Sequence, residues 1–355
     1  MKELNKELRL ISPANKEASN SAKVKIDNLT KPIGSLGALE EIAIKLAGIH
    51  GGLKQIEYKK NIIVMCADNG VIGENVSNCP QEVTHIVTNN LTKEITGLSA
   101  LSSFVGCDRT VIDIGVKGNI NNPKVYDYKL MHATNNIATG PAMSRETAIE
   151  AIKVGISAVD KLVEKGYNMF GTGEMGVANT TTSAAVLSVL EDINVDLVTG
   201  KGSGLTDKQY IHKKEVIKKA IDVNKPNKDD VIDVISKVGG LDIAGLCGCF
   251  IGAAKNKLPI VIDGFIASVA ALCAFNMSPH IQDYTFPSHL SDEPGSILAM
   301  EALGLKPMLH LNLRLGEGSG CPLAFTIIES APYTMLNMGT FEEAKVNKET
   351  YIDIR

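Results

Sequence analysis

The sequence has no excess of charge of one sign that would direct it to a charged partner. Its 355 residues carry 36 lysines and arginines against 40 aspartates and glutamates, a formal net charge of −4. Such a balance creates no field that would steer the protein onto nucleic acid or an anionic membrane. The lysines at 213, 214, 218 and 219 fit the solvent face of a helix better than a nucleic-acid-binding stripe. We therefore expect neither a nucleic-acid partner nor a membrane partner.

Long apolar runs and secretion signals are also missing. The first residues, Met1 to Asn5, are polar and lack the apolar core of a signal peptide. The most apolar window, residues 258–275, contains Pro259 and Asp263, and it favours a buried strand, turn and helix over a membrane span. These features predict a cytoplasmic protein.

Motifs for several common chemistries are absent. None of the seven histidines has the spacing of a metal motif, and no His-Glu-x-x-His occurs, so we expect no metal and no other cofactor. No Gly-x-Ser-x-Gly elbow is present, which disfavours serine-hydrolase chemistry. The seven cysteines show no metal-type pairing and are expected to be reduced, and Cys247 and Cys249, inside an apolar stretch, are expected to pack in the core.

What the sequence does contain is a repeated unit of a short apolar run, a glycine-rich or acidic turn, and a stretch with helical period. Strands alternating with helices predict an α/β fold with a parallel, Rossmann-like sheet flanked by helices. Ligands bind such sheets at the carboxyl ends of the strands, where each of these turns is expected. The predicted strands are residues 62–66, 111–114, 169–170, 259–262 and 308–313, and the turns are 67–70, 115, 171–176, 263–265 and 314–318.

Helices can be predicted where periodicity and capping residues agree. One begins after Ser144 and ends near Gly166, and another begins at the capping box that Thr206 opens and ends before residues 224–227. Residues 38–49 form a third helical stretch, in a segment without strands. We predict a small helical domain from residues 1–55 with 330–355, and a large α/β domain of residues 56–329 that carries the active site.

Two glycine-rich turns are candidates for binding a phosphate. Residues 171–176, GTGEMG, precede Asn179 and Thr180, and the expected helix after them points its N–H groups and dipole at the same place. The turn lacks the Gly-Lys-Ser/Thr of a Walker loop, and tight strand-to-helix turns need glycine in any case. Residues 200–204, GKGSG, would form a second wall with Lys213 as its charge, or would be a mobile loop.

Glu317 lies between glycines in the run 314–320, RLGEGSG. Burial would raise the pKa of such a carboxylate toward the range in which a general base works best. The same residue could instead stabilise the dipole of its own helix, and the residues alone leave both interpretations open. Asp68, Asp113 and Asp263 also follow or end predicted strands, and they indicate a polar crevice without identifying a reaction. The polar loop 288–292, SHLSD, could close over that crevice.

Taken together, these motifs resemble one family, nicotinate-nucleotide–dimethylbenzimidazole phosphoribosyltransferase. The resemblance implies transfer of phosphoribose from nicotinate mononucleotide to an azole base, with inversion at C1′, to give an α-ribazole phosphate and nicotinate. It also implies a homodimer, and a Rossmann-like domain with a small helical domain from both termini. The matching stretches are LTKPIGSLGALEEIA, CADNGV, NCPQEVT, NIATGPAMSRE, GTGEMGVANTT, SKVGGLDIAGLCG, LPIVIDGF, PSHLSDEPG and RLGEGSG.

The resemblance also implies roles for individual residues. Glu317 matches the family's general base, which removes a proton from the azole, and Glu174 is a second candidate catalytic carboxylate. Hydrophobic walls around the base would suit a methylated aromatic ring. The implied phosphate and ribose contacts are Gly173, Met175, Gly176, Asn179, Thr180, Gly202, Gly204, Lys213, Asp263, Gly264 and Ser291, and the implied base pocket is Pro80, Val83, Leu315 and Gly316.

The sequence departs from the family pattern at two places. Residues 200–204 are less apolar than in familiar members, and Val87 stands where some members have a glutamine near the base pocket. The natural base therefore stays open between dimethylbenzimidazole, other benzimidazoles, adenine and phenols. Two other functions are alternatives: a non-catalytic nucleotide-binding protein, and a dehydrogenase suggested by the spacing of Gly171, Gly173 and Gly176. The dehydrogenase lacks a clear ribose-binding acid about twenty residues further on.

Overall fold

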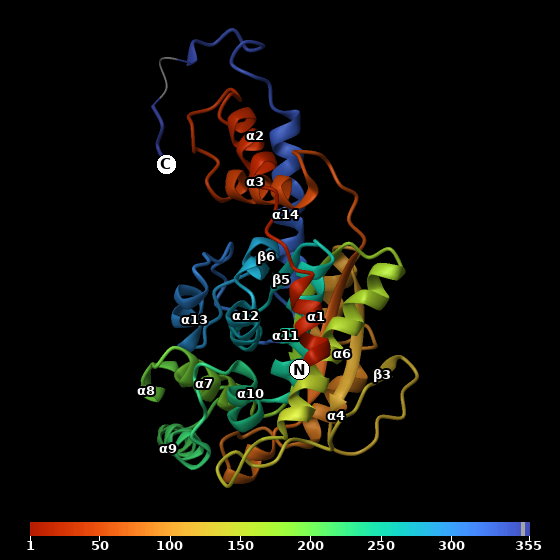
Figure 1. The fold of residues 1–355 in the computed structure, drawn as a ribbon, viewed down its shortest axis with the longest axis vertical. Coiled ribbons are helices and arrows are strands. Elements are labelled where there is room, and N and C mark those ends of the chain that lie inside the picture. Colours follow the sequence, from red (N-terminus) through yellow and green to blue (C-terminus); the bar gives the residue numbers. More distant parts are fainter. Residues whose placement is uncertain (349–351) are drawn as a thin grey trace.

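The computed structural model describes residues 1–348 and 352–355 and has a parallel β-sheet at its centre (Figure 1). In the described residues the sheet has six strands in the order β3-β2-β1-β4-β5-β6, and every pairing is parallel. The predicted α/β fold class is thus confirmed. The strands are β1 (Lys60–Ala67), β2 (Asp108–Gly115), β3 (Val125–Asp127), β4 (Met169–Met175), β5 (Ile260–Ile262) and β6 (Thr285–Pro287).

The strand order reverses between β1 and β4, which lie side by side at the centre of the sheet. From β1 the chain proceeds outward through β2 to β3, and it then returns to build β4, β5 and β6 on the other side of β1. Loops on the two sides of such a point leave in opposite directions, so a crevice opens at the carboxyl ends of the strands. Cys66 near the end of β1 pairs with Met175 at the end of β4.

Helices cover both faces of the sheet. Met65 of β1 would contact a Cβ added at Gly245 in α11, whereas Ile62 would contact one added at Gly318. Residues three apart on a strand face opposite sides, so α11 and the loop around Gly318 lie on opposite faces. The helices are α1 (Lys2–Arg9), α2 (Lys16–Ile26), α3 (Ala38–His50), α4 (Glu82–Asn90), α5 (Gly97–Phe104), α6 (Arg145–Glu164), α7 (Asn179–Leu190), α8 (Val195–Val198), α9 (Asp207–Asn224), α10 (Val231–Val238), α11 (Leu241–Lys255), α12 (Phe265–Met277), α13 (Gly295–Leu303) and α14 (Cys321–Asn337), with 3₁₀ turns at Gly70–Glu74 and Pro279–Tyr284.

Helices α6 and α11 approach closely because glycines lie where they cross. A Cβ on Gly155 would collide with the carbonyl oxygen of Gly245, and a Cβ on Gly248 would collide with that of Ile152. Almost all of α11 is buried, and it also contacts β1, β2 and β4. This helix therefore sits in the core with backbone, rather than side chains, at its contact with α6.

Segments from both ends of the chain pack together above the sheet in Figure 1. Helix α3 contacts both α2 and α14, and Leu29 forms an isolated antiparallel bridge with Thr340. A buried ion pair of 2.7 Å joins Lys31 to Glu40 beside them. Helix α1 instead packs against α11. The domain division at residues 1–55 with 330–355 stays a prediction, and its residues 349–351 lie outside the described residues.

Several predicted elements are confirmed and two are wrong. The predicted helices correspond to α3, α6 with Ser144 as its N-cap, and α9 with the Thr206 capping box. Residues 308–313 do not form a strand, because only Leu309 makes an isolated bridge, with His289. Residues 171–176 are not a turn either, since β4 continues to Met175. Strands β3 and β6 were not predicted, because Val-Tyr-Asp and Thr-Phe-Pro are not apolar runs.

The apolar window 258–275 contains β5, a turn and most of α12, as predicted. In the described part of the chain, no helix combines the length and the apolar character needed to cross a bilayer. All seven cysteines are free, and Cys247 and Cys249 are buried in α11, as predicted, whereas Cys79 is partly exposed.

The α6–α11 crossing can be tested by adding one methyl group. Gly248→Ala should lower the free energy of unfolding by about 1–3 kcal/mol, because the new Cβ meets a backbone carbonyl that cannot rotate away. Gly140→Ala is the control, since a Cβ there meets no atom within 4 Å. Urea unfolding followed by circular dichroism measures both variants. Equal stabilities for the two would contradict the proposed backbone contact.

Candidate active site

A cleft opens at the carboxyl ends of β4 and β5, beside the point where the strand order reverses. Its walls come from the start of α7, the loop before α9, the start of α12, the loop after β6 and the loop before α14. The lining residues are Val76, Ser77, Cys79, Glu174, Met175, Gly176, Val177, Ala178, Asn179, Thr180, Gly202, Ser203, Lys213, Gly264, Phe265, Ile266, Ala267, His289, Ser291, Glu293, Arg314, Leu315 and Gly316.

The amino end of α7 forms one wall of this cleft. Ala178 at the N-cap has a φ of 71°, which is unusual for a residue with a side chain, and no side chain caps the helix. Asn179 and Thr180 of the first turn line the cleft. A helix start without a side-chain cap directs N–H groups and the positive end of its dipole outward. This wall therefore suits an anion such as a phosphate.

Lys213 supplies a positive charge next to this helix start. The side chain is 1% exposed, and its Nζ donates hydrogen bonds to Thr180 Oγ1 at 2.8 Å and to the Gly200 carbonyl at 3.1 Å. Burial lowers the pKa of Lys213 to about 8, and the nearby carboxylate of Glu293 opposes that shift. An anion bound here would stabilise the charged amine. The predicted second wall, with Lys213 as its charge, thus lies at the cleft.

Glu293, which the sequence analysis did not identify, places a carboxylate next to Lys213. The carboxylate of Glu293 accepts a hydrogen bond from the Gly202 N–H, whereas its Oε2 atom is buried without a hydrogen-bond partner. Burial raises the pKa of Glu293, and Lys213 opposes the rise. A phosphate in this part of the cleft would compete with Glu293 for the same donors.

Glu174 belongs to a buried group of carboxylates at the end of β4. Asn179 Nδ2 donates to Glu174 Oε2 and, at 3.2 Å, to Asp242 Oδ2. Burial, followed by the charge of Asp242, raises the pKa of Glu174 to about 8, and burial raises that of Asp242 to about 6. Glu174 is therefore mostly protonated at neutral pH. Within the described residues, no cluster of three or more His, Cys, Asp or Glu side chains is suited to hold a metal ion.

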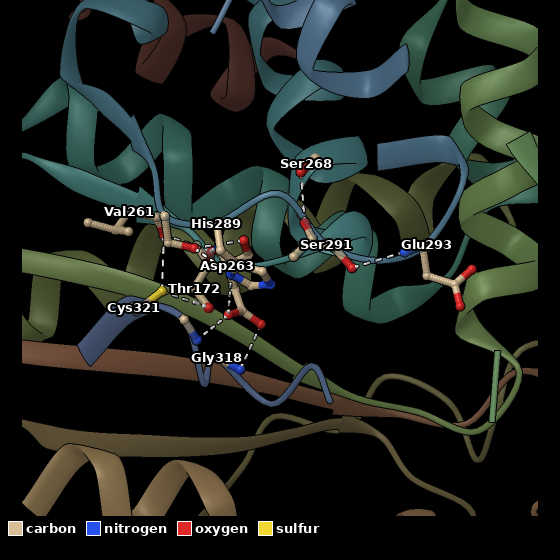
Figure 2. A network of polar contacts seen from close by, with 12 residues as sticks. Thr172, Val261, Asp263, Ser268, His289, Ser291, Glu293, Gly318 and Cys321 are labelled. Atoms are coloured by element: carbon tan, nitrogen blue, oxygen red, sulfur yellow. Dashed lines mark hydrogen bonds and ion pairs between the residues drawn. The ribbon is translucent and has the colours of Figure 1, made fainter. Parts of the chain in front are cut away.

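Glu317 occupies a loop whose backbone is fixed from several sides. Gly316, Glu317 and Gly318 have φ values of 78°, 63° and 96°, three left-handed residues in succession. Asp263 accepts hydrogen bonds from the N–H of Gly318 at 3.0 Å and of Gly320 at 2.7 Å (Figure 2). A non-glycine residue in this conformation is strained, and it persists only where its surroundings hold it.

Gly173 of β4 holds the Glu317 loop from the other side, and together with the hydrogen bonds of Asp263 it forms a clamp on the loop backbone. A Cβ at position 173 would collide with the carbonyl oxygen of Glu317, so the loop can rest directly on β4 only because residue 173 is glycine. Gly171 does the same for Cys321, at the start of α14. Gly171 and Gly173, which were predicted to bind phosphate in a turn, thus lie inside strand β4 and permit close packing. The third glycine of that motif, Gly176, lines the cleft.

Glu317 itself does not line the cleft, although its neighbours Leu315 and Gly316 do. It is 9% exposed, and its Oε2 is buried without a hydrogen-bond partner. Burial raises its pKa, and a hydrogen bond from the Leu98 N–H, in the first turn of α5, partly offsets the rise. The carboxylate thus meets the start of α5 rather than that of its own helix, α14.

The structure brings most of the predicted site residues to one cleft. The eleven that line it are Glu174, Met175, Gly176, Asn179, Thr180, Gly202, Lys213, Gly264, Ser291, Leu315 and Gly316. Those that do not line it are Gly173, Asp263, Gly204, Pro80, Val83 and Glu317. Gly173 and Asp263 hold the Glu317 loop, Gly204 accepts a hydrogen bond from Asn78, and Pro80 and Val83 follow Cys79, which lines the cleft. Their roles in binding or catalysis stay predictions.

Comparison with known proteins gives consistent likenesses. A family model described as phosphoribosyltransferase matches residues 11–346. The chain is 53% identical over 356 aligned residues to a nicotinate-nucleotide–dimethylbenzimidazole phosphoribosyltransferase of Clostridium tetani, covering 100% of this chain and 98% of the relative. A protein of the same name from Ruminiclostridium cellulolyticum is 53% identical, covering 95% and 96%. The crystal structure of CobT from Thermus thermophilus is similar with a TM-score of 0.88 and 34% identity, covering 93% and 99%.

The buried carboxyl group of Glu174 should make stability depend on pH. Its pKa is about 8 in the folded chain and near the ordinary value of 4.5 after unfolding. The folded state keeps a proton that the unfolded state loses, so the free energy of unfolding falls as pH rises between these values. In Glu174→Gln this fall should be smaller, whereas the exposed control Glu301→Gln should follow the wild type. Urea unfolding at about pH 5 and pH 9 measures the difference, and parallel curves for all three proteins would refute it.

Proposed function

The chain belongs to the phosphoribosyltransferase family whose curated relatives are nicotinate-nucleotide–dimethylbenzimidazole phosphoribosyltransferases, and from this membership we propose that it catalyses their reaction. It transfers the phosphoribosyl group of nicotinate mononucleotide to 5,6-dimethylbenzimidazole. One observation carries the proposal: similarity over the whole chain coincides with a cleft that pairs an anion-binding helix start with a buried carboxylate loop.

In the proposed reaction, one nitrogen of the azole attacks C1′ of the ribose while Glu317 removes the proton from the other nitrogen. The bond between C1′ and the nicotinate nitrogen breaks, and its electron pair neutralises the positive pyridinium ring. Nicotinate therefore leaves without help from an acid. Attack from the opposite face inverts C1′, and the products are α-ribazole 5′-phosphate and nicotinate.

The surroundings of Glu317 support its assignment as the general base. Burial raises its pKa toward the range in which a base is most effective, and one carboxylate oxygen has no hydrogen-bond partner in the protein. The clamp by Asp263 and Gly173 holds its backbone, which reduces the reorganisation required at the moment of proton transfer. Glu174, being protonated near neutral pH, adds little negative charge beside it.

The other end of the cleft suits the 5′-phosphate of the nucleotide. Lys213 and the start of α7 place a cation and a helix dipole within one wall, and Gly202 and Ser291 line the cleft beside them. We assign to this end those predicted phosphate and ribose contacts that line the cleft. Gly173, Gly204 and Asp263 do not line it, and the carboxylate of Asp263 is occupied by two backbone N–H groups of the Glu317 loop.

The aromatic base is assigned to the end of the cleft near Leu315 and Gly316, with Pro80 and Val83 near by. Leu315 is 56% exposed, so the base would cover an apolar side chain that now faces solvent. The same pocket could accept another benzimidazole, adenine or a phenol. A non-catalytic nucleotide-binding protein is the alternative outside this enzyme class, and the buried base-like carboxylate argues against it.

A cytoplasmic homodimer is the proposed form of the enzyme. Next to Leu315, helix α5 and the segment before it expose Phe104 and Ile95, apolar side chains of the kind that subunit contacts cover. The homodimer and the cytoplasmic location both agree with the family resemblance.

The activity can be tested by incubating the protein with nicotinate mononucleotide and one of several bases. Wild-type protein should release nicotinate and form an α-nucleotide with at least one azole. Glu317→Gln should lower kcat by about 10²–10⁴-fold, because it removes the general base and retains the size of the side chain. Chromatography of nicotinate and of the nucleotide product measures both quantities.

The exposed Glu301→Gln variant serves as the matched control and should keep the wild-type rate. If the wild type releases no nicotinate with any benzimidazole, purine or phenol, the transferase function is rejected. Full activity of Glu317→Gln would be compatible with the transferase function and would reject Glu317 as the general base.

Lys213 offers a separate test of the phosphate end. Lys213→Met should raise the KM for nicotinate mononucleotide at least tenfold, since a charge-assisted hydrogen bond to an anion contributes roughly 1.5–3 kcal/mol. The KM for the azole should change little. Lys208→Met, on the exposed side of α9, should leave both constants unaltered. An unaltered KM for the mononucleotide in Lys213→Met would place the phosphate elsewhere.

A further inference from the structure

His289 lies on the wall of the cleft and has no part in the mechanism above. It follows β6 closely in the chain, and its side chain is 2% exposed. Both Cε1 and Nε2 lie 3.7 Å from the position of a Cβ added at Gly264, which also lines the cleft. Figure 2 shows the ring between Asp263 and Ser291. The Cε1–Nε2 edge of the ring is thus directed toward the part of the cleft assigned to phosphate and ribose.

The hydrogen bonds of Ser288 determine which nitrogen of His289 carries the proton. Ser288 Oγ lies 2.9 Å from the carbonyl oxygen of Asp263, which can only accept a hydrogen bond, so the hydroxyl proton points there. The same Oγ lies 3.0 Å from His289 Nδ1. Because the single hydroxyl proton is already used, Nδ1 must be the donor in this second contact. The Asp263 carboxylate, 4.0 Å from Nδ1, favours a proton on the same nitrogen.

The ring is also neutral at physiological pH. Burial lowers the pKa of His289 to about 4, so the imidazole holds one proton and that proton is on Nδ1. Nε2 then carries a lone pair. It has no hydrogen-bond partner among the described residues, and it is not one of the fully enclosed unpaired atoms. The lone pair of Nε2 is therefore open to the cleft.

An open lone pair selects for a hydrogen-bond donor on the ligand. Phosphate and carboxylate groups of the nucleotide offer only acceptors, and the proton of the azole is assigned to Glu317. The remaining donors of nicotinate mononucleotide are the two ribose hydroxyls. We propose that His289 is a substrate-binding residue whose Nε2 accepts a hydrogen bond from a ribose hydroxyl, and that it distinguishes ribose from deoxyribose. This inference rests on the proposed function.

The test compares nicotinate mononucleotide with its 2′-deoxy and 3′-deoxy analogues. His289→Phe keeps a flat ring and lacks the acceptor, so kcat/KM on the ribonucleotide should fall about 10–100-fold, the range expected for a lost hydrogen bond in a buried site. With the analogue that lacks the bonded hydroxyl, the variant and the wild type should have nearly equal kcat/KM. His289→Gln, whose Oε1 can accept in place of Nε2, should recover part of the selectivity.

Two further measurements keep the outcomes separate. Ser288→Ala removes the group that holds the tautomer without changing the ring, and it should reduce the preference for the ribonucleotide even if His289→Phe fails to fold. Suppose that the wild type is active and the variants fold. If the variants then lose kcat/KM equally on all three substrates, the role of His289 is overturned and the proposed function stands. If the wild type releases no nicotinate from the ribonucleotide with any base, the proposed function fails and this inference fails with it.

Discussion

The contact on which the site depends most is the pair of hydrogen bonds that the buried carboxylate of Asp263 accepts from Gly318 and Gly320. They hold three successive left-handed residues in place, and with them the backbone of Glu317. Through its own carbonyl oxygen, Asp263 also orients Ser288 and thereby His289. One residue directly after β5 thus holds the backbone of Glu317, the proposed base, on one side and the ring of His289, the proposed hydrogen-bond acceptor, on the other. Burial raises the pKa of this carboxyl group to about 7, and the two N–H donors oppose that rise because they stabilise its charged form.

Cationic and acidic groups lie close together in this site. Lys213 adjoins the start of α7 and the carboxylate of Glu293, and Asn179 in the same helix start donates to the carboxylates of Glu174 and Asp242 at the end of β4. Crowding carboxylates in a place with little water raises their pKa values, so they do not all carry charge at neutral pH. In the proposed function the nucleotide would lie with its phosphate near Lys213 and its reacting carbon near Glu317. The position of the cleft follows from the strand order, because it opens where the order reverses.

The parallel α/β architecture could be predicted from the sequence because its central strands are apolar runs bounded by glycine or acidic residues. Helices α6 and α9 could be predicted because Ser144 and Thr206 are local capping signals. Strands β3 (Val-Tyr-Asp) and β6 (Thr-Phe-Pro) could not, since neither is an apolar run like the Ile-Val-Ile of the equally short β5. Gly171 and Gly173 were predicted to lie in a turn but lie in β4. The sequence around a glycine does not distinguish one that permits close packing inside a strand from one that a turn requires. Glu293, Asp242 and His289 join the site through tertiary contacts, and only His289 lay in a loop that the sequence had indicated.

Helix α14 links the Glu317 loop to the other end of the molecule. It begins at Cys321, directly after the clamped loop, and ends beside α3 in the group of terminal helices (Figure 1). With 17 residues it is about 25 Å long, and Pro332 lies inside it. The Glu317 loop is anchored at the start of this helix, and α3 packs against the helix. A shift of the terminal helices would therefore be passed along α14 to the backbone that carries Glu317, so residues remote from the cleft would influence the geometry proposed for proton transfer.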